Sequence, residues 1–356
     1  MKRFLLISLI LFLSACSQSK SHKKQMDHSE EENQPASGMT IEARFADRLQ
    51  TPWSITKKSS TFFISERNGT IAEVAVKSAK VKRDQVLLNK PLYTEGEGGL
   101  LGFELIPDTN VEALAYHTYL EDGKILNRLI RLQKDEDQWL ETVALLEGIP
   151  GANIHNGGRI KLGPDHKVYV TTGDAAEPEL AQQLESLAGK ILRLELDGSV
   201  PEDNPFAGSP IYSFGHRNPQ GLAWDESGQL YATEHGQSAH DEINRIESGQ
   251  NYGWPIIQGD EESHGMEPPL FHTKGNTWAP SGIAYHDGSL YISNLRGEAV
   301  RLFDLQQRKA EIFANGNGRI RDVLIEKGTL YFITNNTDGR GKPSANDDQL
   351  IGMSLE

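Results

Sequence analysis

Short runs of alternating hydrophobic and polar residues recur along most of the chain, bounded by Gly, Asp or Pro. Alternation with a period of two is typical of β-strands, and the bounding residues are typical of turns. Several runs form pairs joined by an Asp/Gly turn, as in RIKLGPDHKVYV and GIAYHDGSLYI. One short helix is expected, within LAQQLESLAGKILRLEL at residues 180–196. The pattern therefore predicts an all-β protein built from hairpins.

An aromatic residue marks the same position in six of these runs, at intervals of 53, 53, 62, 60 and 40 residues. The six marks are Phe63, Tyr116, Tyr169, Tyr231, Tyr291 and Tyr331. Strand-rich repeats of this length are typical of propeller blades, so we predict a six-bladed β-propeller over residues 39–356. The alternative is an irregular sandwich with coincidental spacing. In a propeller, small molecules bind at the mouth of the central channel, where loops of different blades converge.

The beginning of the chain predicts export and a lipid anchor. Lys2 and Arg3 precede an apolar run at 4–13, which is followed by Ser14, Ala15 and Cys16, the one Cys of the sequence. This is the pattern of a secretory signal, and it resembles a bacterial lipobox, which implies lipidation of Cys16. An ordinary signal peptide with an accidental Cys is the alternative.

Three segments follow from this interpretation. Residues 1–15 are expected to be a lipoprotein signal peptide, and the polar residues 16–38 a flexible tether. Residues 39–356 form the propeller. The protein is therefore expected outside the cytoplasm, lipid-anchored to the cell membrane.

Composition narrows the class of protein. The chain has 356 residues, of which 37% are hydrophobic and 24% charged, so it is long enough for a large core and does not have the composition of a disordered segment. Its formal net charge of −14 argues against a nucleic-acid partner, because there is no excess of Lys and Arg to neutralise phosphates.

A candidate general base lies in GANIHNGGRIKLGPDHKVYVTTGDA. His155 precedes a Gly-rich loop, and Asp174 ends the following strand, so a hairpin could bring the two together. A carboxylate that orients an imidazole and stabilises its cation is a common way to build a base near neutral pH. A purely structural hydrogen-bonding pair is the alternative.

Acidic residues cluster in TEHGQSAHDEINRIESGQNYGWP, where Glu234, Asp241 and Glu242 lie near Gly236 and Gly253. Carboxylates among turns that expose carbonyl groups suit a hard cation such as Ca²⁺. A charged surface loop is the alternative reading of this stretch.

Four arginines lie near expected strand ends: Arg217, Arg296, Arg319 and Arg321. If they meet at one channel mouth, they form a positive basin that selects a polyanionic small ligand, because guanidinium groups suit carboxylates. Alternatively, each arginine pairs with a nearby carboxylate on the surface.

The ordered set of motifs resembles the soluble quinoprotein glucose dehydrogenases and aldose sugar dehydrogenases. The motifs are GGLLGF, HNGGRI, GPD…YVTTGD, GHRNPQGLAW, DEIN…NYGWP, APSG and R-x-R-D, and the resemblance runs from Arg44 to Met353. It implies a six-bladed propeller that uses pyrroloquinoline quinone (PQQ) and calcium.

The resemblance also implies roles for individual residues. His155 is the implied base that takes the proton of the sugar C1 hydroxyl, with Asp174 as its partner, and Arg217 would stabilise negative charge on the cofactor. The implied cofactor-binding residues are Glu97, Arg217, Asn218, Thr277, Arg296, Arg319 and Arg321. Carbonyl groups of Gly236 and Gln237 would hold the cofactor's calcium, and Glu242 with the carbonyl of Tyr252 would form part of a second calcium site.

Three positions depart from the glucose enzymes, which have Gln at the position of Glu97, Lys at that of Arg296 and Pro at that of Gln237. A carboxylate at Glu97 beside an anionic quinone costs energy unless it is protonated or paired with an arginine. The chain is also shorter than the glucose enzymes, which favours the compact aldose branch and a monomer.

The expected function is therefore PQQ- and calcium-dependent oxidation of aldose sugars at C1 to lactones, with electrons passed to an external acceptor. A non-catalytic surface propeller that binds a ligand is one alternative, because a fold does not guarantee an activity. A calcium-dependent lactonase is another, but it would need acidic ligands in the central channel and no arginine basin.

Overall fold

The computed structural model describes residues 41–109 and 111–355, whose regular secondary structure is almost entirely β-strand. This part contains twenty-four strands and one short 3-10 helix, η1 (Pro178–Gln182), which confirms the all-β class. The short helix expected within 180–196 is the 3-10 helix η1, and the stretch then continues into strand β12 (Lys190–Leu194). The expected signal peptide, the tether and Cys16 lie outside the described residues. In the described ranges, no helix is long and apolar enough to cross a membrane.

One sheet has eight strands and consists of two antiparallel four-stranded units. The first unit contains β2 (Pro52–Lys58), β3 (Thr61–Glu66), β4 (Thr70–Ala75) and β5 (Val81–Leu87). The second contains β6 (Leu100–Ile106), β7 (Glu112–Glu121), β8 (Lys124–Asp135) and β9 (Gln138–Pro150). The units meet where β5 pairs in parallel with β9, with Val86 opposite Trp139.

Three four-stranded antiparallel sheets follow in chain order. The first contains β10 (Ile160–Leu162), β11 (Val168–Thr172), β12 and β13 (Ile211–Phe214). The second contains β14 (Pro219–Trp224), β15 (Leu230–Glu234), β16 (Glu242–Ile246) and β17 (Phe271–His272). The third contains β18 (Pro280–His286), β19 (Ser289–Asn294), β20 (Ala299–Asp304) and β21 (Lys309–Asn315).

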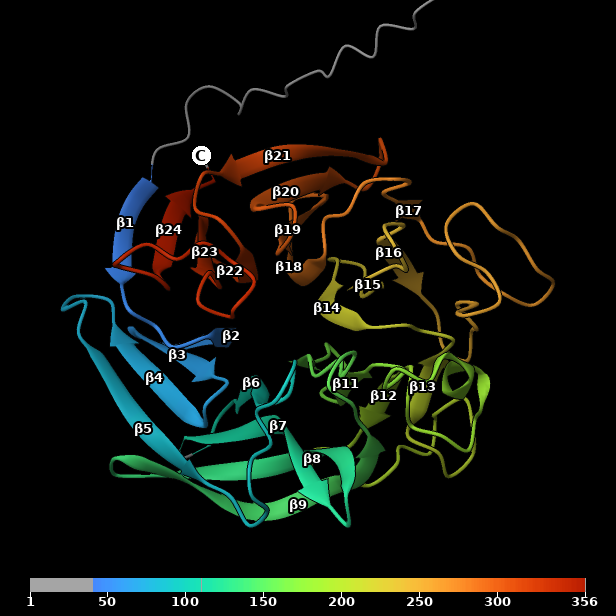
Figure 1. Cartoon of the computed structure of the whole chain (residues 1–356), viewed down its shortest axis with the longest axis horizontal. Coiled ribbons are helices and arrows are strands. Elements are labelled where there is room, and N and C mark those ends of the chain that lie inside the picture. Colours follow the sequence, from blue (N-terminus) through green and yellow to red (C-terminus); the bar gives the residue numbers. More distant parts are fainter. Residues whose placement is uncertain (1–40, 110, 356) are drawn as a thin grey trace, which may run out of the picture. The chain divides into compact units, whose positions relative to one another are not determined.

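The remaining sheet joins the two ends of the described chain. It contains β22 (Ile320–Glu326), β23 (Thr329–Thr334), β24 (Leu350–Ser354) and β1 (Ile41–Ala46). Strand β1 pairs antiparallel with β24, and Ala46 lies opposite Leu350. Figure 1 shows the sheets standing around a common centre, with β1 in blue beside β24 in red. This propeller-like arrangement leaves few free sheet edges.

Each aromatic residue that marked a repeat lies on the second strand of its four-stranded unit. Phe63 is on β3, Tyr116 on β7, Tyr169 on β11, Tyr231 on β15, Tyr291 on β19 and Tyr331 on β23. These strands lie inside their sheets: all five residues of β11 are buried, whereas β5 alternates between buried and more exposed positions. One buried cluster joins Leu114 of β7 to Val170 of β11, so the core lies between neighbouring sheets.

Candidate active site

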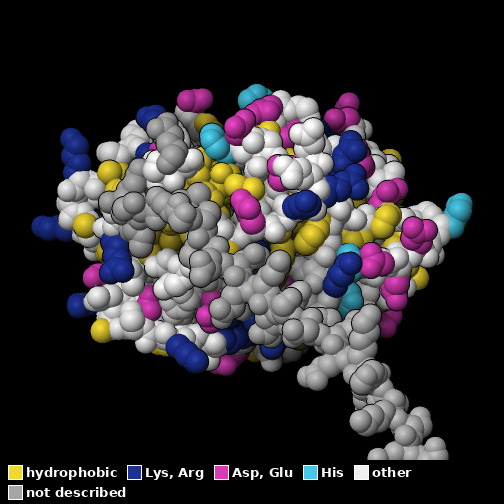
Figure 2. All heavy atoms as spheres, turned by 90° about the horizontal axis from the view of Figure 1, so that it is seen from above, with side chains coloured by type: hydrophobic (Ala, Val, Ile, Leu, Met, Phe, Trp, Pro, Cys, Tyr) yellow, Lys and Arg dark blue, Asp and Glu magenta, His cyan; other side chains and the backbone are white. Residues whose placement is uncertain are grey.

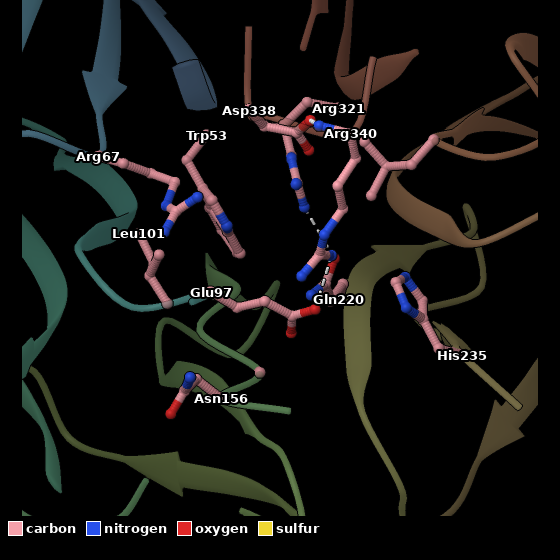
Figure 3. A pocket seen from close by; sticks show the side chains of 12 residues that line it. Trp53, Arg67, Glu97, Leu101, Asn156, Gln220, His235, Arg321, Asp338 and Arg340 are labelled. Carbon is pink, nitrogen blue, oxygen red and sulfur yellow. Dashed lines mark hydrogen bonds and ion pairs between the residues drawn. The ribbon is translucent and has the colours of Figure 1, made fainter. Parts of the chain in front are cut away.

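A cavity of about 420 Å³, partly open to solvent, lies where strand ends and loops from all the sheets meet. Figure 3 shows its lining side chains pointing toward one another from different strands and loops. The lining residues are Trp53, Arg67, Glu97, Leu101, Asn156, Gly157, Gln220, His235, Leu295, Arg321, Asp338 and Arg340. Concave sites where several elements converge are where small molecules typically bind.

The cavity lining has more positive than negative side chains, with three arginines and two carboxylates. Arg340 pairs with Glu97 at 2.8 Å, and Asp338 pairs at 2.8 Å with Arg319, which lies behind the lining. Arg67 donates to the backbone carbonyls of Gly96 and Gly98 instead of a carboxylate. On the outer face shown in Figure 2, by contrast, acidic and basic side chains are interspersed.

Arg321, on β22, is the most deeply placed of the cavity's cations. Its side chain is 6% exposed, and its terminal nitrogens donate to Gln220 and Asn335, each at 3.0 Å. Its Nε is buried and has no hydrogen-bond partner among the described residues. Burial lowers the pKa of Arg321 to about 9, so the group stays charged at neutral pH. A buried guanidinium without a carboxylate partner is costly, and an anionic ligand in the cavity would relieve that cost.

The other predicted arginines lie at different depths. Arg319 is buried, and besides Asp338 it contacts the carbonyl of Leu295 at 3.4 Å. Arg217 lies 5.4 Å from the Trp254 ring centroid and donates to the carbonyl of His235, a cavity residue, at 3.1 Å. Burial lowers the pKa of Arg217, while the carboxylates of Asp174, Glu234, Asp241 and Glu97 oppose this shift.

Only Glu97 and Arg321 of the predicted cofactor residues belong to the cavity lining, and Thr277 and Arg296 are among those outside it. Arg296 is exposed, directly after the lining residue Leu295, and makes no ion pair with any described residue. Thr277 is half-buried beside Trp278, whose backbone amide donates to Asp241. Asn218 is also outside the lining but is fully buried: its Oδ1 accepts the amide of Gly157 at 3.1 Å, and its Nδ2 has no partner in the described part of the chain.

His155 and Asp174 lie side by side, with Nδ1 and Oδ1 2.7 Å apart. Asp174 is fully buried, and its other oxygen accepts the Trp254 indole N–H at 2.8 Å. The other ring nitrogen of His155, Nε2, has no hydrogen-bond partner among the described residues, and the side chain is 14% exposed. The pair is thus built with one oriented nitrogen and one free nitrogen, as a general base requires.

The loop that carries His155 is fixed to the cavity wall. Its backbone amide donates to Oε2 of Glu97 at 3.0 Å, and Glu97 in turn donates its amide to the carbonyl of Asn153. His155 has a φ of 60°, a left-handed conformation that such contacts must support. Gly173 is required opposite it, because a Cβ there would lie 1.9 Å from the carbonyl oxygen of His155.

A second, smaller cavity contains most of the predicted calcium residues. It is lined by Arg217, Glu234, His235, Gly236, Glu242, Tyr252, Trp254, Ile257 and Gln258. Burial, with the neighbouring Glu234, raises the pKa of Glu242 to about 8, and the buried Oε1 of Gln258 has no partner within residues 41–109 and 111–355. Gln237 is exposed and is not part of this lining.

The other acidic residues of this stretch already have partners. Glu234 accepts from the amide of Arg217 at 2.7 Å, and Asp241 from that of Trp278 at 2.6 Å. No group of three or more Asp, Glu, His or Cys side chains in the described part of the chain is arranged to hold a metal ion. A cation at this place would depend on Glu242 together with carbonyl oxygens.

Several lining residues were not found from the sequence: Trp53, Arg67, Leu101, Asn156, Gly157, Gln220, His235, Leu295, Asp338 and Arg340. Burial lowers the pKa of His235 to about 4, so this histidine is neutral in the cavity wall. Arg67 and Arg340 each lie in a turn with a glycine close by, in ERNG and DGRG. An arginine in a Gly-containing turn at a strand end is the sequence pattern that could have identified these two residues as part of the site.

An all-β propeller-like fold with a basic central cavity beside a histidine–aspartate pair defines the class of protein. The chain belongs to the Glucose / Sorbosone dehydrogenase family, whose model matches residues 49–342, and is therefore an oxidoreductase. The class expected from the motifs is confirmed.

Individual relatives agree with this assignment. The chain is 36% identical over 236 residues to quinoprotein glucose dehydrogenase B of Acinetobacter calcoaceticus, an alignment covering 57% of this chain and 49% of that protein. It is 28% identical over 340 residues to the aldose sugar dehydrogenase YliI of Escherichia coli, covering 82% and 89%. The PQQ-bound aldose sugar dehydrogenase of Streptomyces coelicolor superposes with a TM-score of 0.84 at 36% identity, covering 90% of this chain and 99% of that one.

Proposed function

We propose that this protein is a PQQ- and calcium-dependent aldose sugar dehydrogenase that oxidises the C1 hydroxyl of the sugar to a lactone and passes electrons to an external acceptor. One observation carries the proposal. Arg321 is buried in a central cavity close to the His155–Asp174 pair, and no carboxylate of the described residues pairs with it. A PQQ-bound relative of similar fold supports the choice of cofactor.

The residues present fit PQQ, which carries several carboxylates. Four buried donors have no partner among the described residues: Arg321 Nε in the cavity lining, Arg217 Nε in the lining of the smaller cavity, Asn218 Nδ2 and Arg319 Nε. Arg321 and Arg67 would bind the cofactor's carboxylates, because neither has a carboxylate partner in the described chain. Bound PQQ would supply the acceptor for the hydride of C1.

His155 would hold the proton that leaves the sugar. Its free Nε2 would accept the proton of the C1 hydroxyl, and Asp174 would stabilise the resulting imidazolium through the 2.7 Å contact to Nδ1. The Trp254 indole fixes Asp174 from the opposite side, so the imidazole has one orientation. Arg217 would stabilise negative charge that develops on the cofactor.

The alternatives receive less support from the cavity. A lactonase that holds its metal through acidic side chains would need free carboxylates there, but Glu97 and Asp338 are both paired with arginines. A binding module without catalysis would have no use for an oriented histidine with a free Nε2.

The number of blades, the export signal, the lipid anchor and the oligomeric state are also part of the proposal. We interpret the four four-stranded sheets and the two halves of the eight-stranded sheet as six blades. Residues 1–15 are proposed as the signal, lipidation of Cys16 as the membrane anchor outside the cytoplasm, and the monomer as the working state. Mass spectrometry of the mature N-terminus should find a diacylglyceryl group on Cys16; an unmodified Cys16 would contradict the anchor.

Reconstitution tests the proposed activity. The metal-free protein, supplied with PQQ and Ca²⁺, is expected to reduce a redox dye when glucose or another aldose is added. Sugars whose C1 hydroxyl is blocked as a methyl glycoside serve as controls and should give no reduction. Dye reduction that is absent with every aldose, although PQQ is bound, would contradict the assignment.

Calcium should stabilise the chain through Glu242. Because a ligand that binds only the folded state stabilises it by mass action, saturating Ca²⁺ should raise the melting temperature by about 5 °C. Glu242→Gln should lose most of this rise, because it removes the carboxyl group that would ligate the ion in the small cavity, whereas the exposed Glu262→Gln should keep it. An equal rise in both variants, measured by thermal unfolding, would contradict a calcium site at Glu242.

A further inference from the structure

Glu97 is an anomalous residue in a cavity that fits an anion. Its carboxylate lies in the lining near Arg67 and Arg321, and its side chain is 21% exposed. In Figure 3 it points into the space between the arginines. An unpaired negative charge at this place would repel a polycarboxylate ligand. Binding of such a ligand therefore requires a positive group that neutralises Glu97.

Both oxygens of Glu97 are engaged. Oε1 accepts from Arg340 at 2.8 Å, and Oε2 accepts from the backbone amide of His155 at 3.0 Å. Burial alone would raise the pKa of Glu97, but Arg340 and the His155 amide reverse the shift and lower it. The carboxylate therefore stays ionised, and its charge is balanced by Arg340.

Arg340 is held in place from the last sheet. It lies in the loop between β23 and β24, where its backbone amide donates to Asp338 Oδ1 at 2.9 Å. Asp338 Oδ2 pairs with Arg319 at 2.8 Å. Gly341 keeps this loop tight, because a Cβ there would lie 2.5 Å from the carbonyl oxygen of Asn336.

These contacts form a chain of alternating charges from Arg319 through Asp338, Arg340 and Glu97 to the amide of His155. The two cations and the two anions in it cancel. The surplus charge of the cavity is therefore supplied by Arg67 and Arg321, which have no carboxylate partner in the described part of the chain.

We propose that Arg340 is a positioning residue for the cofactor site: it neutralises Glu97, so that this carboxylate can hold the His155 loop without repelling an anionic cofactor. The inference rests on the proposed function. Glu97 and Arg340 would act together in cofactor binding, because the charge of each cancels that of the other.

The alternative is that Arg340 contacts the cofactor directly. The two roles differ in what happens when Glu97 is also neutral. If Arg340 acts by compensation, removing both charges restores binding; if it is a ligand of the cofactor, binding stays weak. Its side chain is 51% exposed, so its replacement should leave the fold intact.

The test is a double-mutant cycle read by equilibrium binding of PQQ to the Ca²⁺-loaded full chain. Arg340→Gln should weaken binding about tenfold, the effect expected of one uncompensated charge at a partly exposed site. Glu97→Gln keeps an acceptor oxygen for the His155 amide and should bind PQQ at least as tightly as the unchanged protein. Glu97→Gln combined with Arg340→Gln should return to within about threefold of the unchanged protein.

Further variants separate charge from structure. Arg340→Lys should bind nearly as well as the unchanged protein, and Arg308→Gln, at an exposed turn, should have no effect. The loss in Arg340→Gln should shrink at high salt, because screening weakens charge repulsion. A double variant as weak as Arg340→Gln, or an Arg340→Gln variant with unchanged affinity, would overturn the proposal. If the unchanged protein itself does not bind PQQ, the proposed function fails, and this inference fails with it.

Discussion

Replacing His155 with alanine is expected to slow aldose oxidation by 10²–10⁴-fold while leaving PQQ binding intact. A positioned general base contributes about this factor. His155 has the geometry for the role, because Asp174 holds Nδ1 at 2.7 Å and Nε2 is free. The measurement is the rate of dye reduction by PQQ-loaded protein, with cofactor affinity determined separately.

Two further variants sharpen this test. Asp174→Asn should keep the fold of the hairpin but lower the rate, because an amide does not stabilise an imidazolium as a carboxylate does. His264→Ala, at an exposed position, should leave the rate unchanged. A His155→Ala variant that keeps most of its activity would remove His155 from the reaction.

Replacing Arg321 with glutamine is expected to weaken PQQ binding by about 100-fold. Truncating one member of a buried, hydrogen-bonded charge pair costs about 2–5 kcal/mol, which corresponds to a factor of roughly 30 or more. Arg321 would form such a pair with a carboxylate of bound PQQ, because it is 6% exposed and no carboxylate of the described residues already pairs with it. Equilibrium titration of the variant with PQQ measures the loss.

The matched control is again Arg308→Gln, which removes a charge from an exposed turn. Arg321→Lys should recover part of the affinity, because it keeps the charge but loses the planar fork that suits carboxylates. Arg321→Gln should also fold, because Gln220 and Asn335 can bond the new amide. Unchanged affinity in Arg321→Gln would contradict the basic cavity as the cofactor site.

Much of the fold could be predicted because inner strands carry a strong local pattern. Tyr169 and Tyr231 lie on strands whose residues are all buried, so aromatic and apolar residues concentrate there and repeat with each unit. The parallel pairing of β5 with β9 could not be predicted, because it joins edges of separate units, with Gln85 opposite Gln138. No local pattern encodes such a contact.

The site was predictable where it is local. His155 and Asp174 flank one hairpin, β10–β11, whose register places Ile160 opposite Val170, so proximity follows from short-range structure. Arg340 meets Glu97 across 243 residues of chain, and nothing in either turn indicates the other. Likewise, position near a strand end could not separate Arg321, which faces the cavity, from Arg296, which is exposed.

Calorimetric titration of the Ca²⁺-loaded protein with PQQ tests the central claim most directly, because it reports binding without requiring the right sugar or acceptor. A central cavity with uncompensated, buried guanidinium groups predicts one equivalent of PQQ bound at micromolar concentration or tighter. The absence of binding at micromolar PQQ, with the protein folded and calcium present, would contradict it.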